Sequence, residues 1–425
     1  MGGRLDIAII GGSLAGCMAA VALRRAGHRV TVYERSRRGL VGRGGGVTTS
    51  QGVLDGLKAA GLIDRDFPSA PYHELLLTRA TGPDDRLGRC PLRLPLRMHC
   101  LHWSGLWENI RKRIPDAAYH NGRAVAQASE RGGGVALRFE DGREAHADLA
   151  CFADGYASQG RAAMFPDATL DYRDYLVWRG VVGEDRVGTD PILDAHPRIS
   201  LREGRGSFIS YIIHDRDGAM SPGTRLINWA VYLEMPARDL DGFMIDADGR
   251  RRIGTIPAGA MRPEQDAALK AAMRRALPGY FADMVAASED NQIQLIYTAR
   301  PPAYRKGRMC LLGDAGAMVP PLTGAGLFKA FENAVGLAAA LDGAGPDAAD
   351  LNARLDAWSD AQMAHADAML EMGYQMERAF IYETIDLATA SEADARRWFD
   401  EVLRIAPEFS YFDPELARPR EGAAP

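Results

Sequence analysis

The sequence has too few cysteines, too widely spaced, to build a disulfide frame or a zinc site. It has five cysteines in 425 residues, and no two of them form a CxxC pair. An odd number of scattered cysteines is typical of reduced thiols in an intracellular protein. We therefore expect no disulfide and no bound metal.

Long hydrophobic runs are also missing. No apolar stretch approaches the roughly 18 residues that a membrane-spanning helix needs. The first strand pattern begins shortly after Met1, so a signal peptide is not predicted. These absences favour a soluble, cytoplasmic protein that has no membrane partner.

Charge of one sign does not accumulate in the chain. Lys and Arg number 51 and Asp and Glu number 56, which gives a formal net charge of −5. A nucleic-acid surface would need clustered basic residues, so nucleic acid is not an expected partner. The apolar fraction of 47% is ample for a buried core, and the length predicts two or three domains.

The beginning of the chain has the pattern of a β-turn-α-turn-β unit. A short apolar strand over Leu5–Ile10 leads into the glycine-rich turn 11–16, and helical spacing follows. Gly27 stops this helix in the manner of a C-terminal glycine cap, and a second strand over 30–33 ends at Glu34. Such a unit is typical of dinucleotide-binding folds.

The glycine-rich turn has the residues that a pyrophosphate site requires. Gly11 permits a tight turn, and Gly16 lets the helix pack closely on the strand, so that free amides and the positive helix end face the ligand. Ser13 replaces the middle glycine of the G-x-G-x-x-G pattern and is small enough to leave the approach open. Glu34 lies where a carboxylate accepts hydrogen bonds from a ribose. The alternative is a purely structural turn between strand and helix.

The rest of the sequence predicts a β-rich middle and a helical end. Proline punctuates two of the expected strands, and alternating residues predict a hairpin. Strands are expected near 75–77, 91–96, 135–152 and 309–312, and the stretch 172–294 is rich in strands but interrupted by a helix at 263–277. Other helices are expected near 50–60, 105–114 and from Gly324 onward. No second glycine-rich βαβ unit is visible for a nicotinamide cofactor.

Two further motifs lie far along the chain from the first turn. Asp154-Gly155 follows an apolar run and precedes Arg161. Gly313-Asp314 follows another apolar run and precedes the segment Pro320–Gly326. A strand end with a helix-capping aspartate is the alternative interpretation of Gly313-Asp314, but it does not explain the proline and glycines that follow.

In this order and spacing, the three motifs resemble those of the class A flavoprotein monooxygenases. The resemblance implies that the first turn holds the ADP part of a non-covalent FAD and that Asp154-Gly155 lies near the pyrophosphate. It also implies that Asp314 bonds the ribityl chain and that Pro321 lies at the isoalloxazine ring. The cofactor-binding residues that it implies are Gly11, Ser13, Leu14, Ala15, Gly16, Glu34, Arg35, Arg43, Val125, Asp154, Gly155, Gly313, Asp314, Pro321, Gly324, Ala325 and Gly326.

Shorter motifs resemble one subgroup of that family. Gly11-Gly12-Ser13, Trp178-Arg179-Gly180 and Asn228-Trp229 with Tyr232 are similar to the 2,6-dihydroxypyridine 3-monooxygenase group and its hydroxynicotinate relatives. The loop 320–323 reads Pro-Pro-Leu-Thr and departs from that subgroup.

The resemblance implies an α/β fold with interleaved parts. A Rossmann-like FAD-binding domain would comprise residues 1–70, 97–170 and 295–345, and a β-sheet substrate domain would comprise 71–96 and 171–294. A C-terminal helical segment would cover 346–425 and could mediate a homodimer.

The implied activity is FAD- and NAD(P)H-dependent hydroxylation of a phenolic or hydroxylated N-heteroaromatic ring. In this family NAD(P)H binds transiently, and a flavin C4a-hydroperoxide formed with O2 transfers the hydroxyl group. Epoxidation or oxidative decarboxylation on the same fold, or a non-catalytic flavin-binding protein, are the alternatives. A related halogenase is disfavoured because the sequence has no Trp-x-Trp motif.

Substrate contacts are expected from one face of the β-rich segment, because alternate residues of a strand share a face. We predict Tyr211 and His214 as catalytic residues, although Tyr211 could equally be a half-buried strand residue. The predicted substrate-binding residues are Tyr211, Asn228, Tyr232 and Pro321, and His99 and His102 are further candidates for a base.

Overall fold

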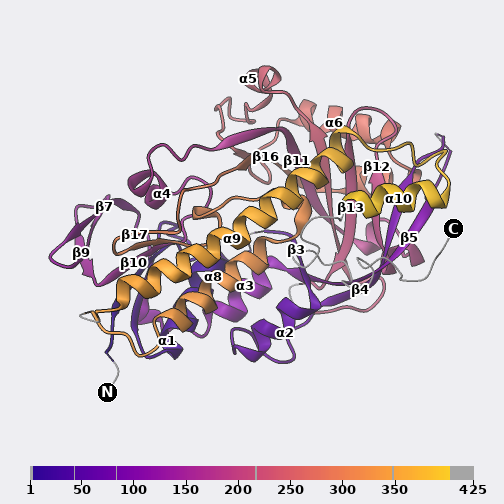
Figure 1. Ribbon diagram of the computed structural model, residues 1–425. Helices are drawn as coiled ribbons and strands as arrows, with labels where there is room; N and C mark the ends of the chain where they lie inside the picture. Colours follow the sequence, from indigo (N-terminus) through magenta and orange to yellow (C-terminus); the bar gives the residue numbers. More distant parts are fainter. Residues whose placement is uncertain (1–2, 43, 83, 216–217, 347–348, 403–425) are drawn as a thin grey trace.

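The computed structural model describes residues 3–42, 44–82, 84–215, 218–346 and 349–402. Within these ranges the chain forms a six-stranded sheet, a nine-stranded sheet and a small three-stranded sheet, with helices packed around them (Figure 1). The α/β fold predicted from the sequence is confirmed.

The six-stranded sheet has the order β17-β18-β10-β1-β2-β6 and is parallel except for the pair β17–β18. Its strands are β1 (Asp6–Ile10), β2 (Arg29–Glu34), β6 (Tyr119–Asn121), β10 (Leu149–Phe152), β17 (Arg305–Lys306) and β18 (Met309–Leu311). Because β1, β10 and β18 are parallel neighbours, the loops that follow them leave from one edge of the sheet. The three motifs found in the sequence lie in those loops.

Two helices lie side by side against this sheet: α1 (Leu14–Arg25) and α8 (Gly326–Ala340). Small residues such as Ala19 and Ala20 are completely buried in α1, which lets the two helices approach closely. The flanking helices are α2 (Gln51–Ala59), α3 (Trp103–Arg111) and α4 (Gln159–Met164).

The nine-stranded sheet has the order β15-β16-β11-β14-β13-β12-β4-β5-β3. Its strands are β3 (Gly46–Ser50), β4 (Ala70–Arg79), β5 (Arg89–His102), β11 (Asp171–Gly183), β12 (His196–Ser200), β13 (Gly206–Ile213), β14 (Leu226–Glu234), β15 (Thr255–Ile256) and β16 (Glu289–Thr298). One face carries Trp178, Phe208 and Trp229 and belongs to one apolar core with α6 (Pro263–Ala276) and α7 (Gly279–Ala287). The register places Arg179, Tyr211 and Asn228 on the opposite face.

Two sequence predictions about strands need correction. β4 and β5 are much longer than the short strands predicted, because Pro95 is accommodated at a register shift, opposite Glu74. The predicted hairpin over 135–152 ends early. Only β8 (Gly134–Phe139) and β9 (Glu144–Ala147) pair, beside β7 (Val125–Arg131), and Asp148 then bonds to Asp6 and directs β10 into the parallel sheet.

The long helix α9 (Leu351–Glu377) crosses the molecule from the six-stranded sheet to the nine-stranded sheet (Figure 1). Met369, Met372 and Met376 are buried along it and fill the core between this helix and the sheets. At its end Glu377 is 1% exposed and pairs with Arg173 of β11 at 2.9 Å. A π-helical turn (Arg378–Tyr382) and α10 (Glu392–Val402) follow. Among the helices that the structure describes, none is long and apolar enough to cross a membrane.

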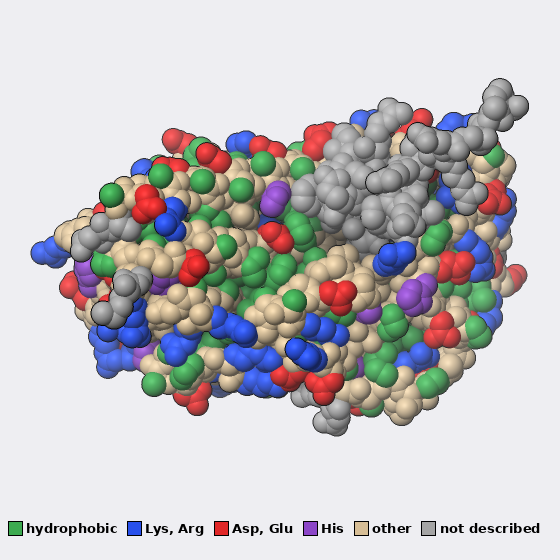
Figure 2. Space-filling model, turned by 60° about the horizontal axis from the view of Figure 1, so that its bottom comes forward, with side chains coloured by type: hydrophobic (Ala, Val, Ile, Leu, Met, Phe, Trp, Pro, Cys, Tyr) green, Lys and Arg blue, Asp and Glu red, His purple; other side chains and the backbone are tan. Residues whose placement is uncertain are grey.

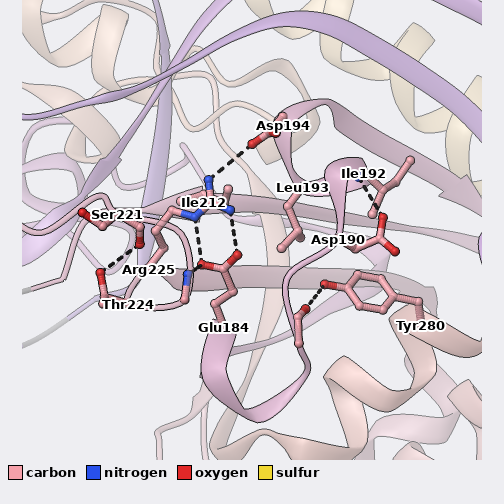
Figure 3. Close-up of polar contacts among 12 residues, drawn as sticks. Glu184, Asp190, Ile192, Leu193, Asp194, Ile212, Ser221, Thr224, Arg225 and Tyr280 are labelled. Carbon is pink, nitrogen blue, oxygen red and sulfur yellow. Dashed lines mark hydrogen bonds and ion pairs between the residues drawn. The ribbon is translucent and has the colours of Figure 1, made fainter.

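An ion-pair network ties the start of β14 to the segment after β11 (Figure 3). Arg225 donates to both carboxylate oxygens of the fully buried Glu184, at 2.9 and 2.6 Å, and also contacts Asp194 at 3.3 Å. A bidentate guanidinium–carboxylate pair fixes geometry as well as charge. The network therefore links the end of β11 to the start of β14, two adjacent strands in the interior of the nine-stranded sheet.

The chain passes between the two large sheets several times, so neither is built from one continuous segment. On this pattern of pairing we propose the interleaved domain division described above. The nine-stranded sheet extends beyond those bounds, because β3 pairs with β5, β5 continues to His102 and β16 continues to Thr298.

Buried neutral histidine makes stability depend on pH. His196 is fully buried on β12, and burial together with the charge of Arg198 lowers its pKa to about 3. Below pH 6.5 the unfolded chain therefore binds a proton that the folded chain does not, and stability falls as the pH falls. We expect this residue alone to remove about 2 kcal/mol of unfolding free energy between pH 6.5 and pH 5. Urea unfolding at both pH values measures the change.

The matched variants for this prediction are His196→Asn and, on the exposed surface, His73→Gln. Asparagine at position 196 should flatten the pH dependence, whereas the change at position 73 should leave it as in the unmodified protein. If the unfolding free energy of His196→Asn fell with pH as steeply as that of the unmodified protein, groups other than His196 would cause the loss of stability at low pH.

Candidate functional site

The three motifs come together at one edge of the six-stranded sheet. The amide of Ala153 donates to the Ile10 carbonyl at 2.7 Å, and a Cβ added at Gly11 would lie 2.3 Å from the Ala153 carbonyl oxygen. A Cβ added at Gly313 would lie 2.8 Å from that of Ala15. In open parallel sheets ligands bind at the carboxyl edge, where these loops meet.

Glu34 and Gly12 fix the shape of the first turn. Glu34 is 6% exposed, and its two carboxylate oxygens accept hydrogen bonds from the amides of Gly12 at 2.8 Å and Ser36 at 2.7 Å. The structure therefore gives Glu34 a role in holding the turn, and its contact with a ribose stays a prediction.

Two aromatic residues that the sequence analysis missed also hold this turn. The Gly12 carbonyl accepts hydrogen bonds from the Trp107 indole at 2.7 Å and from the Tyr119 hydroxyl at 3.0 Å. A Cβ at Gly12 would lie 2.0 Å from the Tyr119 hydroxyl oxygen, so only glycine fits. Both residues lie about 100 positions from Gly12 in the sequence, so no local pattern indicated these contacts. The one clue was the position of Trp107 on the apolar face of its predicted helix.

Arg161 joins the second motif to the third. Its guanidinium is buried and donates to the carbonyls of Asp314 and Ala315, both at 3.1 Å, and to that of Tyr156. Asp154 accepts from the Gln159 amide at 2.8 Å, and burial raises the pKa of its carboxyl group. The other oxygen of Asp154 is buried, with no hydrogen-bond partner in the described part of the chain.

A buried lysine, also missed, holds the third motif. Lys329 of α8 is 1% exposed, and its ammonium donates to the Asp314 carboxylate at 2.7 Å and to the Ala317 carbonyl at 2.6 Å. Asn333, one turn further along, accepts from the Gly313 amide at 2.8 Å. Helix α8 therefore fixes the loop 313–317 by direct contacts.

The segment after this loop forms one wall of a cavity. Gly324 has a φ of +65°, a left-handed conformation that glycine adopts readily, and α8 begins two residues later. The Thr323 hydroxyl accepts from the amide of Ala325, the N-cap residue of α8, at 3.1 Å, and Ala325 itself has no side chain that could cap the helix. The amides of the first turn give this end of α8 its positive charge. The cavity has a volume of 130 Å³ and is lined by Gln294, Ile296 and Tyr297 of β16 with Asp314, Met318, Val319, Pro320, Pro321 and Gly326.

Tyr211 and Asn228 of the nine-stranded sheet contact the backbone at Gly46. Asn228 accepts a hydrogen bond from the Gly46 amide at 2.7 Å, and the Tyr211 ring lies against Gly46, where an added Cβ would come within 2.3 Å of it. Tyr232 shares their face, as predicted, and packs near Tyr175. Arg43, which precedes this glycine stretch, lies outside the described residues.

The geometry at the first turn fits a dinucleotide. Gly11 has a φ of +102°, and a Cβ at Gly16 would lie 1.9 Å from the Gly11 carbonyl oxygen. The Ser13 side chain caps no amide of α1 among the residues described, so the first amides of the helix remain free for an anion. Leu14 begins the helix, Arg35 is exposed after β2, and Val125 is buried at the start of β7.

Comparison with known proteins gives a consistent result. A family described as FAD binding domain matches residues 4–164, and one described as FAD binding domain-like matches residues 172–298. The 2,6-dihydroxypyridine 3-monooxygenase of Paenarthrobacter nicotinovorans is 28% identical over 86% of this chain and 88% of its own. The solved 2,6-dihydroxypyridine-3-hydroxylase from Arthrobacter nicotinovorans has a TM-score of 0.79 at 25% identity and covers 92% of this chain and 97% of its own. The 3-amino-4-hydroxybenzoate 2-monooxygenase of Streptomyces cremeus is 28% identical over 80% of this chain and 79% of its own.

The protein is a flavin-dependent monooxygenase, and its motifs and fold resemble those of the class A flavoprotein monooxygenases.

As a flavin-dependent monooxygenase, the protein uses FAD as its cofactor, with NAD(P)H and O2 as co-substrates. The chemistry that FAD would supply at this site is electron transfer from NAD(P)H and activation of O2. The first turn and α1 would hold the pyrophosphate, Asp314 the ribityl chain, and Pro321 to Gly326 the ring. The positive end of α8 favours negative charge beside it.

The surface of this monooxygenase has charge of both signs but not evenly spread. Figure 2 shows a face with a hollow that has hydrophobic side chains at its centre and Lys and Arg side chains along one border. The formal net charge of the chain is nevertheless −5. A positive border of this kind favours the approach of anionic ligands.

The candidate histidines of the monooxygenase are engaged in structural contacts. The His214 Nδ1 bonds to the Asp215 carbonyl at 2.7 Å, and its Nε2 accepts from the His102 amide at 3.4 Å. His102 caps α3 by accepting from the Gly105 amide, and His99 contacts Ser69 and Gln51. Burial lowers the pKa of His214, which favours the neutral imidazole. Both of its ring nitrogens contact backbone groups. We do not assign His214 to catalysis.

Proposed function

We propose that this enzyme hydroxylates a phenolic or hydroxylated N-heteroaromatic ring. The observation that carries the proposal is the cavity between β16 and the loop 318–321, which adjoins Asp314 and the start of α8. The relatives named above act on hydroxylated pyridine and benzoate rings, which supports the same substrate class.

The side chains around this space suit an aromatic ring. Ile296, Met318 and Pro321 offer apolar contacts, and Gln294 offers an amide that can hydrogen-bond a ring hydroxyl or ring nitrogen. A hydroxylating enzyme must keep water away from its oxidant, and apolar side chains around this space serve that purpose.

We assign Tyr211 the role of a hydrogen-bonding partner to the ring oxygen of the substrate. It lies on the sheet face that carries Asn228, beside the backbone of Gly46, and is 6% exposed. A hydroxyl held there can stabilise negative charge that develops on the ring oxygen. Asn228 positions the Gly46 backbone, and Tyr232 contributes to the same face.

The test of the function is a substrate panel. Purified, FAD-loaded protein is assayed for NAD(P)H oxidation and oxygen uptake with phenols, hydroxybenzoates, hydroxypyridines and hydroxyquinolines. Stimulation by one ring class, with a product heavier by one oxygen atom, supports the proposal. A yellow protein that ignores every ring would contradict it and favour epoxidation, oxidative decarboxylation or a non-catalytic flavoprotein.

Tyr211→Phe is expected to lower kcat/KM by about 10- to 100-fold, because it removes one hydrogen bond to a group that becomes charged. FAD content should not change, since the ring still packs on Gly46. Steady-state kinetics with the best substrate of the panel measure the effect.

The matched control is Tyr72→Phe. The Tyr72 hydroxyl is also buried in this sheet, but it donates to the Leu193 carbonyl at 2.9 Å and accepts from the Ile212 amide at 2.6 Å. Its loss should cost about 1 kcal/mol of stability and leave kcat/KM unchanged. Equal kinetic effects of the two variants would remove Tyr211 from the mechanism.

A further inference from the structure

Arg179 has an unusual position in the nine-stranded sheet. It lies in the middle of β11, opposite Ala230 of β14 and Gln292 of β16. Paired residues of antiparallel strands share a face, so its side chain is on the face of Asn228 and Tyr211. This is the face that we assign to the substrate.

Contacts with the glycine stretch place the guanidinium more closely. A Cβ added at Gly45 would lie 2.9 Å from Nη2 of Arg179 and 2.6 Å from Oδ1 of Asn228. The Asn228 oxygen already accepts from the Gly46 amide. The head group of Arg179 therefore lies beside the Asn228 carboxamide, against the backbone of residues 45–46.

The charge of Arg179 is not neutralised by the rest of the described chain. The side chain is half-buried, and no ion pair or hydrogen bond joins its guanidinium to the described residues. Two other arginines of this sheet are paired: Arg173, on the same strand, with Glu377 at 2.9 Å, and Arg225 with Glu184 at 2.6 Å. Withdrawing a cation from water without a partner is unfavourable, and a bound anion would offset that cost.

We propose that Arg179 is a specificity-determining residue that binds an oxyanion on the aromatic substrate. A guanidinium presents five donors in a planar fork that matches the delocalised oxygens of a carboxylate, or one ionised ring oxygen. Tyr211 and the amides of Asn228 and Gln292 share its face of the sheet and can donate to the same group. The inference rests on the proposed function and narrows it to anionic rings.

Two sources of the oxyanion are distinguished by two pairs of measurements. Binding is followed through the change in the flavin spectrum of the FAD-loaded, full-length protein, which requires no turnover. The first arm compares salicylate with neutral salicylamide, and it tests a carboxylate. The second arm titrates 2,6-dihydroxypyridine at pH values below and above its ionisation, and it tests a ring oxyanion.

We expect the unmodified protein to prefer the ionised form in at least one arm. Arg179→Gln should weaken binding of that form by about 10- to 100-fold and leave the neutral form within about threefold. Arg179→Lys should recover part of the loss, because it keeps the charge without the planar fork. Arg251→Gln, at a surface ion pair in which both side chains are at least 70% exposed, is the control and should change neither form.

The opposite results overturn the inference. Equal affinity of the unmodified protein for ionised and neutral forms in both arms would do so without any variant. So would an Arg179→Gln variant that shifts the FAD reduction potential but weakens both forms equally, since Arg179 would then serve the cofactor. Rings that bind without stimulating NAD(P)H oxidation would instead count against the proposed function alone.

Discussion

Gly11→Ala is expected to give a folded protein that retains almost no FAD. Gly11 has a φ of +102°, and a Cβ there would lie 2.3 Å from the Ala153 carbonyl oxygen and 3.0 Å from the Asp154 amide. The substitution must therefore push apart the two turns that hold the pyrophosphate. We expect FAD affinity to fall by at least about 100-fold, which corresponds to roughly 3 kcal/mol. Flavin absorbance per protein after gel filtration measures the effect.

Gly27→Ala is the control that distinguishes the steric clash expected at Gly11 from the strain of a positive φ. Gly27 has a similar φ of +93°, but an added Cβ there meets nothing within 4 Å. It should cost about 1 to 2 kcal/mol of stability through its backbone conformation and leave FAD content unchanged. If Gly11→Ala retained FAD as well as Gly27→Ala, the assignment of the first turn as the pyrophosphate site would be wrong.

Asp314→Asn is expected to destabilise the protein even when FAD has been removed. The substitution leaves the ammonium of Lys329, which is 1% exposed, without its counter-ion and with only neutral acceptors, the new amide oxygen and the Ala317 carbonyl. Removing one member of a buried ion pair costs about 3 to 5 kcal/mol. Because the Asp314 side chain is itself 55% exposed, we expect the lower end of that range. Urea unfolding of the FAD-free protein measures it, and FAD affinity should fall in parallel.

Lys329→Met and the double variant complete this test. Losing the ammonium should cost less, since the half-exposed Asp314 can be rehydrated. The double variant should be more stable than Asp314→Asn alone, because it contains no unpaired buried charge. Asp367→Asn breaks an exposed pair with Arg300 and should cost under about 1 kcal/mol. If Asp314→Asn lost as little stability as Asp367→Asn, Lys329 would not depend on the Asp314 carboxylate.

The parts of the fold that depend on neighbouring residues could be predicted from the sequence. The strand Asp6–Ile10, the turn that follows and the helix Leu14–Arg25 agree closely with the prediction. Strand periodicity and glycine position act within a few residues, so one segment carries the whole signal. The five cysteines are free, as expected, and burial raises the pKa of Cys17 to about 12.

The parts that depend on distant partners could not be predicted. Trp107 and Tyr119 hold Gly12 from about 100 residues away, and Lys329 is unremarkable in its helix until its ammonium is seen beside Asp314. The lengths of β4 and β5 depend on pairing across the sheet rather than on their prolines. Local patterns do not specify such contacts, which only the folded topology brings about.

The substrate face illustrates the same limit. Alternation along the predicted strand placed Asn228 and Tyr232 on one face, and the register adds Tyr211 of β13 to that face. It could not show that β13 ends at Ile213, so that His214 lies beyond the strand with both ring nitrogens occupied. Nor could it show that the head group of Arg179 lies beside the Asn228 carboxamide.

The central claim is that this protein transfers one oxygen atom from O2 to an aromatic ring. The most direct test is mass spectrometry of the product formed with NAD(P)H under ¹⁸O-labelled dioxygen, using the ring that best stimulates turnover. We predict a hydroxylated ring with one labelled oxygen atom and none from water. A product whose added oxygen comes from water, or NAD(P)H oxidation that yields only hydrogen peroxide with every ring of the panel, would contradict the claim.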